Sequence, residues 1–390
     1  MIFELIGQEA IADRFRRLIH NRRIGSGYLF AGPEGSGKTS MALNVAAMLL
    51  CRDPQNGEPC GTCPSCTKMR HLNHPNFHFV HATPRAKSPS DSDPFQGLSD
   101  EDIAVIREER ARLTGDPYAD MNIPGANQIL IAYARYIKKE LAMKPAESDR
   151  QVVLVYRAEL AGIEAFNSLL KILEEPPART TFILTTPALD LIPVTIRSRC
   201  QIVKFNPVPD TLIREYLVSR GQDDAAAQRI ARLCGGNVRQ AKALMDADFS
   251  EVDGTLLDFW RIMMGGKLNP GKPEERWVTA ADIGELIENY TALAKNDAAA
   301  FRNQLRFMIF FLRDAQLLSA SPEAEDKLIN THLVKELEGF VRYYPGFPYF
   351  EMIRLTENTL ADSGKNMYIP ALLANLFLEF RTALLETRKR

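Results

Sequence analysis

The sequence predicts an α/β domain built on a parallel sheet, followed by a region that is almost entirely helical. Three observations support this fold class. Short apolar segments typical of buried strands alternate with amphipathic segments as far as Pro207, which is the pattern of a parallel α/β sheet. A glycine-rich loop separates the first such strand from the next helix. After Pro209 the strand signals stop, and apolar residues recur at helical spacing.

The elements of the α/β region follow from the spacing of its apolar residues. Apolar side chains three and four positions apart predict amphipathic helices, whereas short apolar runs bounded by charges, glycine or proline predict buried strands. The predicted helices lie at residues 4–20, 40–50, 129–144 and 162–174, and the predicted strands lie at residues 28–31, 152–156, 181–185 and 201–205.

Other regions of the chain differ from this α/β pattern. Residues 83–127 are predicted to form an excursion, rich in proline and acidic at its start, that contains one amphipathic helix at 102–113. The residues of this excursion predict no catalytic or binding function for it. Residues 210–247 are predicted to form a small helical unit, and residues 250–386 several longer helices with a loop at 265–273.

The composition is that of a folded globular protein. Of 390 residues, 45% are hydrophobic and 25% are charged, and 48 Lys and Arg against 49 Asp and Glu leave a formal net charge of −1. These values exclude a disordered chain and a disulfide-dense miniprotein, and they argue against a protein that coats nucleic acid by bulk electrostatics. Because no apolar run is long enough to cross a bilayer and no export signal is visible, we expect a cytoplasmic protein without membrane contact.

Residues 32–39 match the phosphate-binding loop pattern G-x-x-x-x-G-K-[ST] at every position. In such a loop the glycines let backbone N–H groups face phosphate oxygens, while Lys38 would reach the β- and γ-phosphates and the Thr39 hydroxyl would bind Mg²⁺. The alternative is a glycine-rich turn with a chance Lys-Thr pair, and the strand before the loop and the helix after it argue against that alternative. The predicted nucleotide-binding residues here are Gly32, Pro33, Glu34, Gly35, Ser36, Gly37, Lys38, Thr39 and Ser40.

Hydrolysis of a bound nucleotide needs more than this loop. A carboxylate at the end of a neighbouring strand must organise Mg²⁺, and a second one usually orients the attacking water. At the end of the 152–156 strand the sequence has Tyr156 and Arg157 instead of an acidic pair, with Glu159 two residues further on. The sequence therefore supports nucleotide binding more strongly than turnover.

Four cysteines lie close together in a segment rich in proline and glycine. Cys51, Cys60, Cys63 and Cys66 form the pattern C-x8-C-x2-C-x2-C, whose thiolates would complete the tetrahedral shell of a structural Zn²⁺ ion. The alternative is a set of reduced free thiols. The nearby histidines at positions 71, 74 and 78 are expected to be ordinary packing or surface residues, since four cysteines already fill a zinc shell.

Taken together, these motifs and three further segments resemble the AAA+ subunits of the bacterial DNA polymerase III clamp loader. The segments are IGQE at residues 6–9, NSLLKILEEPP at 167–177 and TIRSRC at 195–200. The resemblance covers about residues 1–245. It implies an AAA+ (P-loop NTPase) domain at residues 1–206, a small helical lid at 207–248 and an all-α collar domain for oligomerisation at 249–390.

The resemblance also implies roles for individual residues. Arg199 matches the arginine finger that reaches into the ATP site of a neighbouring subunit, where its charge would stabilise a transferring phosphoryl group. Thr186, or its neighbour Thr185, matches the polar sensor after the central strand, and Arg239 matches the lid arginine that contacts phosphate in the same chain. Without the flanking motifs, Arg199 would be read as a surface ion-pair partner and Arg239 as a solvated helix residue.

The pair Tyr156-Arg157 shifts the resemblance from the gamma/tau motor subunits to the delta-prime branch, whose members need not hydrolyse ATP. The implied function is that of a loader subunit that binds ATP (with Mg²⁺) or ADP, carries structural Zn²⁺, and helps to load the sliding clamp on primed DNA. The implied partners are the gamma/tau and delta subunits and, through the complex, the clamp and primer–template DNA. The alternative is an active gamma/tau-like ATPase in which Glu159 or another carboxylate replaces the missing pair.

The C-terminal helices carry apolar stripes at helical spacing. Most of each stripe is expected to form the domain's own core, while the resemblance implies that part of these helices, including the segments 306–314 and 366–385, packs against other subunits. The stripe positions are Leu305, Met308, Ile309, Leu312, Ala315, Leu372, Leu376, Phe380 and Leu384.

Overall fold

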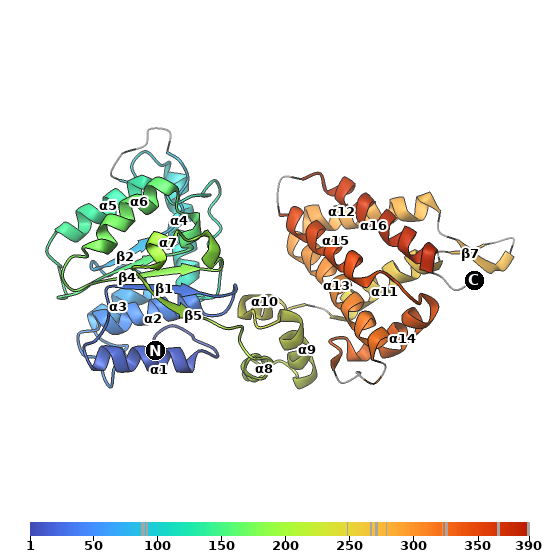
Figure 1. The fold of residues 1–390 in the computed structure, drawn as a ribbon, viewed down its shortest axis with the longest axis horizontal. Coiled ribbons are helices and arrows are strands. Elements are labelled where there is room, and N and C mark those ends of the chain that lie inside the picture. The colour runs from blue at the N-terminus through green and yellow to red at the C-terminus, as the bar shows by residue number, and fades with distance from the viewer. Residues whose placement is uncertain are drawn as a thin grey trace. The chain divides into compact units, whose positions relative to one another are not determined.

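Figure 1 shows the computed structural model of the chain, which divides into two compact units, Met1–Met245 and Asp246–Arg390. Parts of the predicted excursion at 83–127, of the predicted loop at 265–273 and of the segment 366–385 fall outside the described residues. The structure describes residues 1–86, 90, 93–247, 249–265, 267–269, 272–277, 279–321, 323, 327–364 and 367–387.

A five-stranded sheet, parallel throughout, forms the centre of the first unit and confirms the predicted α/β class. The spatial order is β2-β3-β4-β1-β5, so β4 lies between β3 and β1. Because all strands run the same way, the loops that follow β1, β3 and β4 meet at one edge of the sheet. The strands are β1 (Gly27–Ala31), β2 (Phe77–Val80), β3 (Gln151–Val155), β4 (Thr180–Thr186) and β5 (Gln201–Lys204).

Helices cover both faces of this sheet (Figure 1). Tyr28 and Phe30 of β1 pack in the cluster that includes Phe15 of α1, whereas Leu29 between them packs in the cluster on the opposite face, as the alternation of side chains along a strand requires. One face is covered by α1 (Glu9–His20), α2 (Lys38–Leu50) and α3 (Pro64–Arg70), and the other by α5 (Ile131–Ala142) and α6 (Ile163–Glu174).

Strand β2 is not among the predicted strands. It has only four residues and pairs on one side only, with β3, where Phe77 lies opposite Val152. His78 interrupts the apolar run, so the segment lacks the continuous pattern that marks the other strands. Its place in the sheet therefore depends on pairing with β3 more than on its own sequence.

The predicted excursion contains helix α4 (Asp100–Gly115), a few residues longer at each end than the predicted helix. A capping box begins it: Ser99 Oγ accepts a hydrogen bond from the Asp102 backbone N–H (3.1 Å), and Asp102 Oδ2 accepts one from the Ser99 N–H (3.2 Å). Ile106 and Leu113 are buried against the domain. After α4 the chain returns towards its own N-terminal segment, where Tyr118 Oη accepts a hydrogen bond from the Ile6 N–H (2.8 Å).

Three more helices complete the first unit, and the start of α10 contacts the phosphate loop directly. The Val238 N–H donates to the Gly35 carbonyl oxygen (3.1 Å), and Lys242 forms ion pairs with Glu4 (2.5 Å) and Asp116 (2.7 Å). The predicted boundary near residue 206, between an α/β domain and a lid, stays a prediction. These helices are α8 (Asp210–Ser219), α9 (Asp224–Cys234) and α10 (Val238–Ala243), and the short helical segments before them are η1 (Ala158–Leu160), η2 (Leu189–Leu191) and α7 (Val194–Arg197).

The second unit is mostly helical, as predicted. Trp260 is fully buried and packs against Phe311, Phe340 and Phe380, with ring centroids 5.0, 5.2 and 5.4 Å away. Its helices are α11 (Phe249–Gly265), α12 (Ala280–Asn296), α13 (Ala298–Ala320), η4 (Thr331–Leu333), α14 (Val334–Tyr343), α15 (Tyr349–Asp362) and α16 (Ile369–Thr387).

The apolar stripes of this unit lie mainly in its core. Seven of the nine predicted stripe positions are buried, and Ile309 and Leu372 are partly buried. The predicted loop at 265–273 instead overlaps a two-stranded antiparallel hairpin. Its strands are β6 (Lys267–Asn269) and β7 (Lys272–Trp277). Its sequence is mostly charged and lacks the apolar alternation that marks a strand, which is why a loop is the sequence-based expectation.

None of the described helices has the length and apolar content that a membrane span requires.

Asn44 of α2 holds the start of the chain in place. Its side chain is fully buried. Its Oδ1 accepts hydrogen bonds from the Ile2 and Phe3 N–H groups (both 3.1 Å), and its Nδ2 donates to the Phe3 carbonyl (2.9 Å).

We expect Asn44→Ala to lower the free energy of unfolding of the first unit by about 2–3 kcal/mol, because it leaves these backbone groups without partners. Urea unfolding measures this loss. The exposed Asn21→Ala is the control, expected to change stability by less than about 0.5 kcal/mol; an equal loss in both variants would contradict the role given to Asn44.

Candidate nucleotide-binding and metal sites

The phosphate loop runs from the end of β1 to the first turn of α2, as its sequence predicts. Gly35 and Gly37 adopt φ angles of +67° and +90°, a left-handed backbone that favours glycine. A Cβ on Gly35 would also lie 1.8 Å from the Asn237 side-chain oxygen. Glycine at position 35 therefore lets the loop turn and lets the start of α10 approach it.

The ammonium group of Lys38 lies folded over this loop. Its Nζ donates hydrogen bonds to the carbonyl oxygens of Gly32 (2.8 Å) and Pro33 (2.6 Å). Burial lowers the pKa of Lys38 to about 8, although the Glu34 carboxylate acts in the opposite direction. A phosphate group beside Lys38 would favour the charged form, so the lysine is suited to bind an anion.

A cavity lies between this loop and the ends of β3 and β4. Of the predicted loop residues, Glu34, Gly35, Gly37, Lys38 and Thr39 line it, whereas Gly32, Pro33, Ser36 and Ser40 do not. The Ser40 hydroxyl instead donates to the Glu4 carbonyl. The other lining residues are Pro117, Tyr118, Ala119, Asp120, Tyr156, Arg157, Thr185, Thr186, Pro187 and Arg239.

The end of β3 brings Tyr156 and Arg157 to this cavity, where an acidic pair would stand in a hydrolase. Arg157 has a left-handed φ of +52°, its N–H donates to Thr185 Oγ1 (3.1 Å), and its Nε pairs with Glu159 Oε1 (3.0 Å). The Glu159 side chain is only 5% exposed and is not among the cavity-lining residues. In this structure the Glu159 carboxylate is therefore engaged by Arg157 and does not face the cavity.

Both candidate sensor threonines are buried at the end of β4 and line the cavity. The Thr186 hydroxyl donates to the Ala188 carbonyl (3.2 Å) and accepts from the Ala188 N–H (3.1 Å). The Thr185 hydroxyl accepts from the Arg157 N–H and keeps its own proton free to donate. The structure thus brings both residues to the phosphate loop.

Arg239 of α10 reaches the same cavity from the other side. Its Nη1 forms ion pairs with Glu34 Oε2 (3.3 Å) and with Asp120 Oδ2, and its Nε donates to the Tyr118 carbonyl (3.0 Å). The Tyr156 hydroxyl donates to Asp120 Oδ1 (2.7 Å). Burial, together with the neighbouring Asp120 carboxylate, raises the pKa of Tyr156 and keeps it a neutral donor.

Residues 117–120 were not predicted to belong to a site. They lie more than 75 positions after the phosphate loop, in the excursion to which the sequence assigns no chemistry. No local motif marks Asp120, because its role comes only from contacts with Tyr156 and Arg239, which the fold brings to it. A tertiary contact of this kind leaves no spacing signal in the sequence.

Arg199 lies outside the cavity of its own chain. Its guanidinium pairs with Glu174 (2.6 Å), donates to the Thr195 carbonyl (3.0 Å), and has a side chain that is 35% exposed. Exposed apolar residues lie nearby in sequence: Leu191 is 64% exposed and Val194 is 67% exposed. Arg199 is therefore not among the residues that line the cavity beside the phosphate loop.

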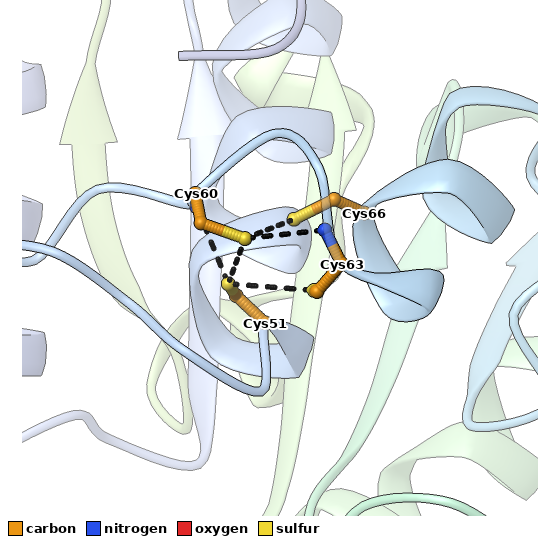
Figure 2. Close-up of side chains that lie close together, drawn as sticks. All are labelled: Cys51, Cys60, Cys63 and Cys66. Carbon is orange, nitrogen blue, oxygen red and sulfur yellow. Dashed lines mark hydrogen bonds between the residues drawn. The ribbon is translucent and has the colours of Figure 1, made fainter.

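The four predicted metal ligands come together at the end of α2 and the start of α3 (Figure 2). Their sulfur atoms all lie within 4.8 Å of one another, and the Cys51–Cys60, Cys51–Cys63 and Cys60–Cys66 Sγ distances are 3.6, 3.9 and 3.9 Å. A tetrahedral zinc ion with Zn–S bonds of ~2.3 Å places its sulfurs ~3.8 Å apart. The cluster therefore fits such an ion.

Backbone N–H groups support thiolate character in this cluster. The Cys60 N–H donates to Cys51 Sγ (3.3 Å) and the Cys63 N–H to Cys60 Sγ (3.3 Å). Donation from the Thr62 and Cys63 N–H groups lowers the pKa of Cys60 to about 6, whereas burial raises the pKa of Cys51 and of Cys66. The metal would hold four protein ligands and no water, which is the pattern of a structural site.

Three histidines follow the cluster in sequence, at positions 71, 74 and 78. Neither His71, His74 nor His78 belongs to the group of residues placed to hold an ion, within the described part of the chain. His74 is buried, bonds to Ser65 Oγ (3.3 Å) and accepts a hydrogen bond from the Asn76 N–H (3.1 Å). Burial lowers the pKa of His78 to about 4 and keeps its ring neutral. For His74 and His78 this agrees with a packing role.

A family model described as "DNA polymerase III, delta subunit" matches residues 7–209, just over half of the chain. The chain belongs to this family. The match covers the phosphate loop, the cysteine cluster and the Arg199 segment, and together with the parallel sheet it confirms the predicted AAA+ domain of a clamp-loader subunit.

The chain is also similar to named subunits of DNA polymerase III. The tau subunit of DNA polymerase III from Bacillus subtilis is 25% identical over 364 residues, which cover 90% of this chain and 56% of tau. The delta-prime subunit of the same organism is 24% identical over 257 residues, 65% of each chain. This member of the family therefore spans about half the length of the tau subunit it matches.

Among solved structures, a DNA polymerase III gamma subunit-related protein from Thermotoga maritima aligns over 95% of this chain and 99% of its own, with 16% identity and a TM-score of 0.44.

Proposed function

We propose that this chain is a delta-prime-type subunit of the DNA polymerase III clamp loader that binds ATP or ADP without hydrolysing it. One observation carries the proposal. A complete phosphate loop faces a cavity in which the end of β3 contributes Tyr156 and Arg157 and no acidic pair. Such a site has the groups that bind phosphates, while the end of β3 supplies no carboxylate to organise Mg²⁺ and water for hydrolysis.

The residues around the cavity support nucleotide binding. Lys38, Thr39 and Arg239 line it together with the loop backbone, and each offers a donor or a cation to phosphate oxygens. The Thr39 hydroxyl would bind Mg²⁺ when ATP is present. The sensor role of Thr186 and the contact of Arg239 with phosphate in the same chain are part of this proposal.

Arg199 is proposed to act on a neighbouring subunit. It lies outside its own cavity, and its guanidinium is held by the exposed Glu174 and by the Thr195 carbonyl. The exposed apolar side chains Leu191 and Val194 suit burial against a partner. The proposed partners are the gamma/tau and delta subunits and, through the assembled complex, the sliding clamp and primer–template DNA. A cytoplasmic location is part of the same proposal.

The second candidate is an active gamma/tau-like ATPase. The tau subunit of Bacillus subtilis matches more of this chain than the delta-prime subunit does. Such an enzyme needs a carboxylate at the phosphates. The two carboxylates that line the cavity, Glu34 and Asp120, are both paired with Arg239, and Glu159 is paired with Arg157.

We also propose that the four-cysteine cluster holds one structural Zn²⁺ ion. The sulfur spacing and the N–H groups that donate to sulfur support it. The ion would join the end of α2 to the start of α3 and so stiffen the segment that connects the phosphate-loop helix to β2.

The first test measures ATP binding and hydrolysis by the isolated, zinc-replete chain. We expect saturable binding by calorimetry and hydrolysis no faster than in buffer, and Lys38→Ala should weaken binding by about ten- to a hundredfold because it removes a charged donor to phosphate. The exposed Lys139→Ala is the control. Robust turnover that Lys38→Ala abolishes would overturn the non-hydrolysing assignment in favour of the ATPase.

The second test concerns Arg199 in a complex reconstituted with gamma/tau and delta subunits. Arg199→Ala should lower ATP hydrolysis at the partner interface by on the order of a hundredfold, because it removes a cation from the reacting phosphates, while the chain's own ATP affinity stays unchanged. Arg179→Ala removes another ion-paired surface arginine and should have no effect. Failure of the wild-type chain to co-elute with the other subunits would contradict the proposed partnership itself.

The third test measures metal content. We expect one equivalent of zinc per chain by elemental analysis, and close to none after Cys63→Ser, because three sulfurs do not complete the shell. Cys234→Ser serves as the matched control, since this buried thiol lies outside the cluster and bonds to the Ala231 carbonyl (3.1 Å). Retention of zinc by the Cys63 variant would show that the ligand set is wrong.

A further inference from the structure

The segment 117–120 lies on the nucleotide cavity, and contacts near its start tie it to the rest of the first unit. The Tyr118 hydroxyl accepts a hydrogen bond from the Ile6 N–H (2.8 Å), and Asp116, just before the segment, pairs with Lys242 (2.7 Å). All four of its residues line the cavity beside the phosphate loop. We refer to residues 117–120 as the strap.

Asp120 is the charged residue of the strap, and it engages the groups that a phosphate would use. Its Oδ2 pairs with Arg239 and its Oδ1 accepts from the Tyr156 hydroxyl (2.7 Å), with Arg157 Nη1 3.9 Å from Oδ2. A carboxylate and a phosphate oxygen make the same charge-assisted hydrogen bonds to a guanidinium group. The carboxylate of Asp120 therefore takes the contact to Arg239 that is proposed for phosphate.

The charges and the size of the cavity agree with this competition. Three cations line it, Lys38, Arg157 and Arg239, and two carboxylates, Glu34 and Asp120, offset most of their charge. Its free volume is about 40 Å³, enough for a few water molecules, whereas small-molecule sites commonly have ~300 Å³ or more. Displacement of the strap would give a polyphosphate more room and a larger net positive charge.

We propose that the strap is a built-in competitor of nucleotide: Asp120 occupies the cations of the site, and a bound polyphosphate displaces it from Arg239 and Arg157. This inference rests on the proposed nucleotide binding and adds its regulation. Because the strap is also tied to Ile6 and adjoins the Asp116–Lys242 pair, its release would loosen contacts between the N-terminal segment, the excursion and α10. Nucleotide binding is thereby coupled to the arrangement of these elements.

The test compares ATP–Mg²⁺ binding by the wild-type chain and Asp120→Asn, measured by calorimetry at one ionic strength. The variant should bind on the order of tenfold more tightly, because the competing charge is gone. Asp149→Asn is the control: it also removes a carboxylate charge and an ion pair, with Arg179, but it lies outside both the cavity and the strap, and its affinity should stay within twofold of wild type. Inorganic tripolyphosphate should gain as much as ATP, whereas adenosine should gain nothing.

Two further measurements test the same proposal if Asp120→Asn folds poorly. Tyr156→Phe removes only the hydroxyl that holds Asp120 and should give a smaller gain in affinity of about two- to fivefold. In the wild-type chain, ATP should raise amide hydrogen exchange across residues 118–121, since Pro117 has no amide hydrogen.

The outcomes separate this inference from the proposed function. Unchanged or weaker ATP binding by Asp120→Asn, with normal binding by wild type, overturns the strap and leaves the proposed function standing. Binding by Asp120→Asn alone supports the strap and overturns nucleotide binding by the native chain. No binding by either protein overturns both, and an equal gain in Asp149→Asn shows a general charge effect and overturns the strap.

Discussion

The parallel pairing of β4 with β1 on one side and β3 on the other is the constraint on which the rest of the first unit depends. Ala31 lies opposite Thr186, and Val155 lies opposite Leu184, so the phosphate loop, the Tyr156-Arg157 pair and the two threonines emerge at one edge. A register shift of one residue would turn every strand side chain to the opposite face and separate these groups. The buried clusters on both faces oppose such a shift.

The charged groups at that edge favour the proposed binding of nucleotide over its hydrolysis. Where a hydrolase has an acidic pair, this chain has a phenol and a guanidinium, and the guanidinium is held in place by Glu159. Replacing acids with a cation strengthens attraction for phosphate and removes ligands for Mg²⁺. In the proposed function, this sheet edge binds nucleotide as a structural element, and Arg199 makes the subunit's contribution to a partner.

The long excursion is part of the site and not an appendage. Helix α4 packs Ile106 and Leu113 against the domain, and the following strap brings Asp120 to Tyr156 and Arg239. Glu4 and Asp116 both pair with Lys242 of α10, so the N-terminal segment, the excursion and α10 share one set of charges. A ligand that disturbs any of these pairs acts on all three elements, because the pairs have common partners.

By itself, the sequence determined the α/β class, four of the five strands, the phosphate loop and the four-cysteine cluster, because each depends on local spacing: a period of apolar residues, a glycine pattern or a ligand pattern. Tertiary structure alone decided what local spacing does not encode. The short edge strand β2 exists through pairing with β3, the hairpin of the second unit forms from mostly charged segments, and Asp120 reaches the nucleotide cavity from a segment without any motif. The physical reason is the same in each case: these features consist of contacts between residues distant in sequence, and such contacts exist only once the chain has folded.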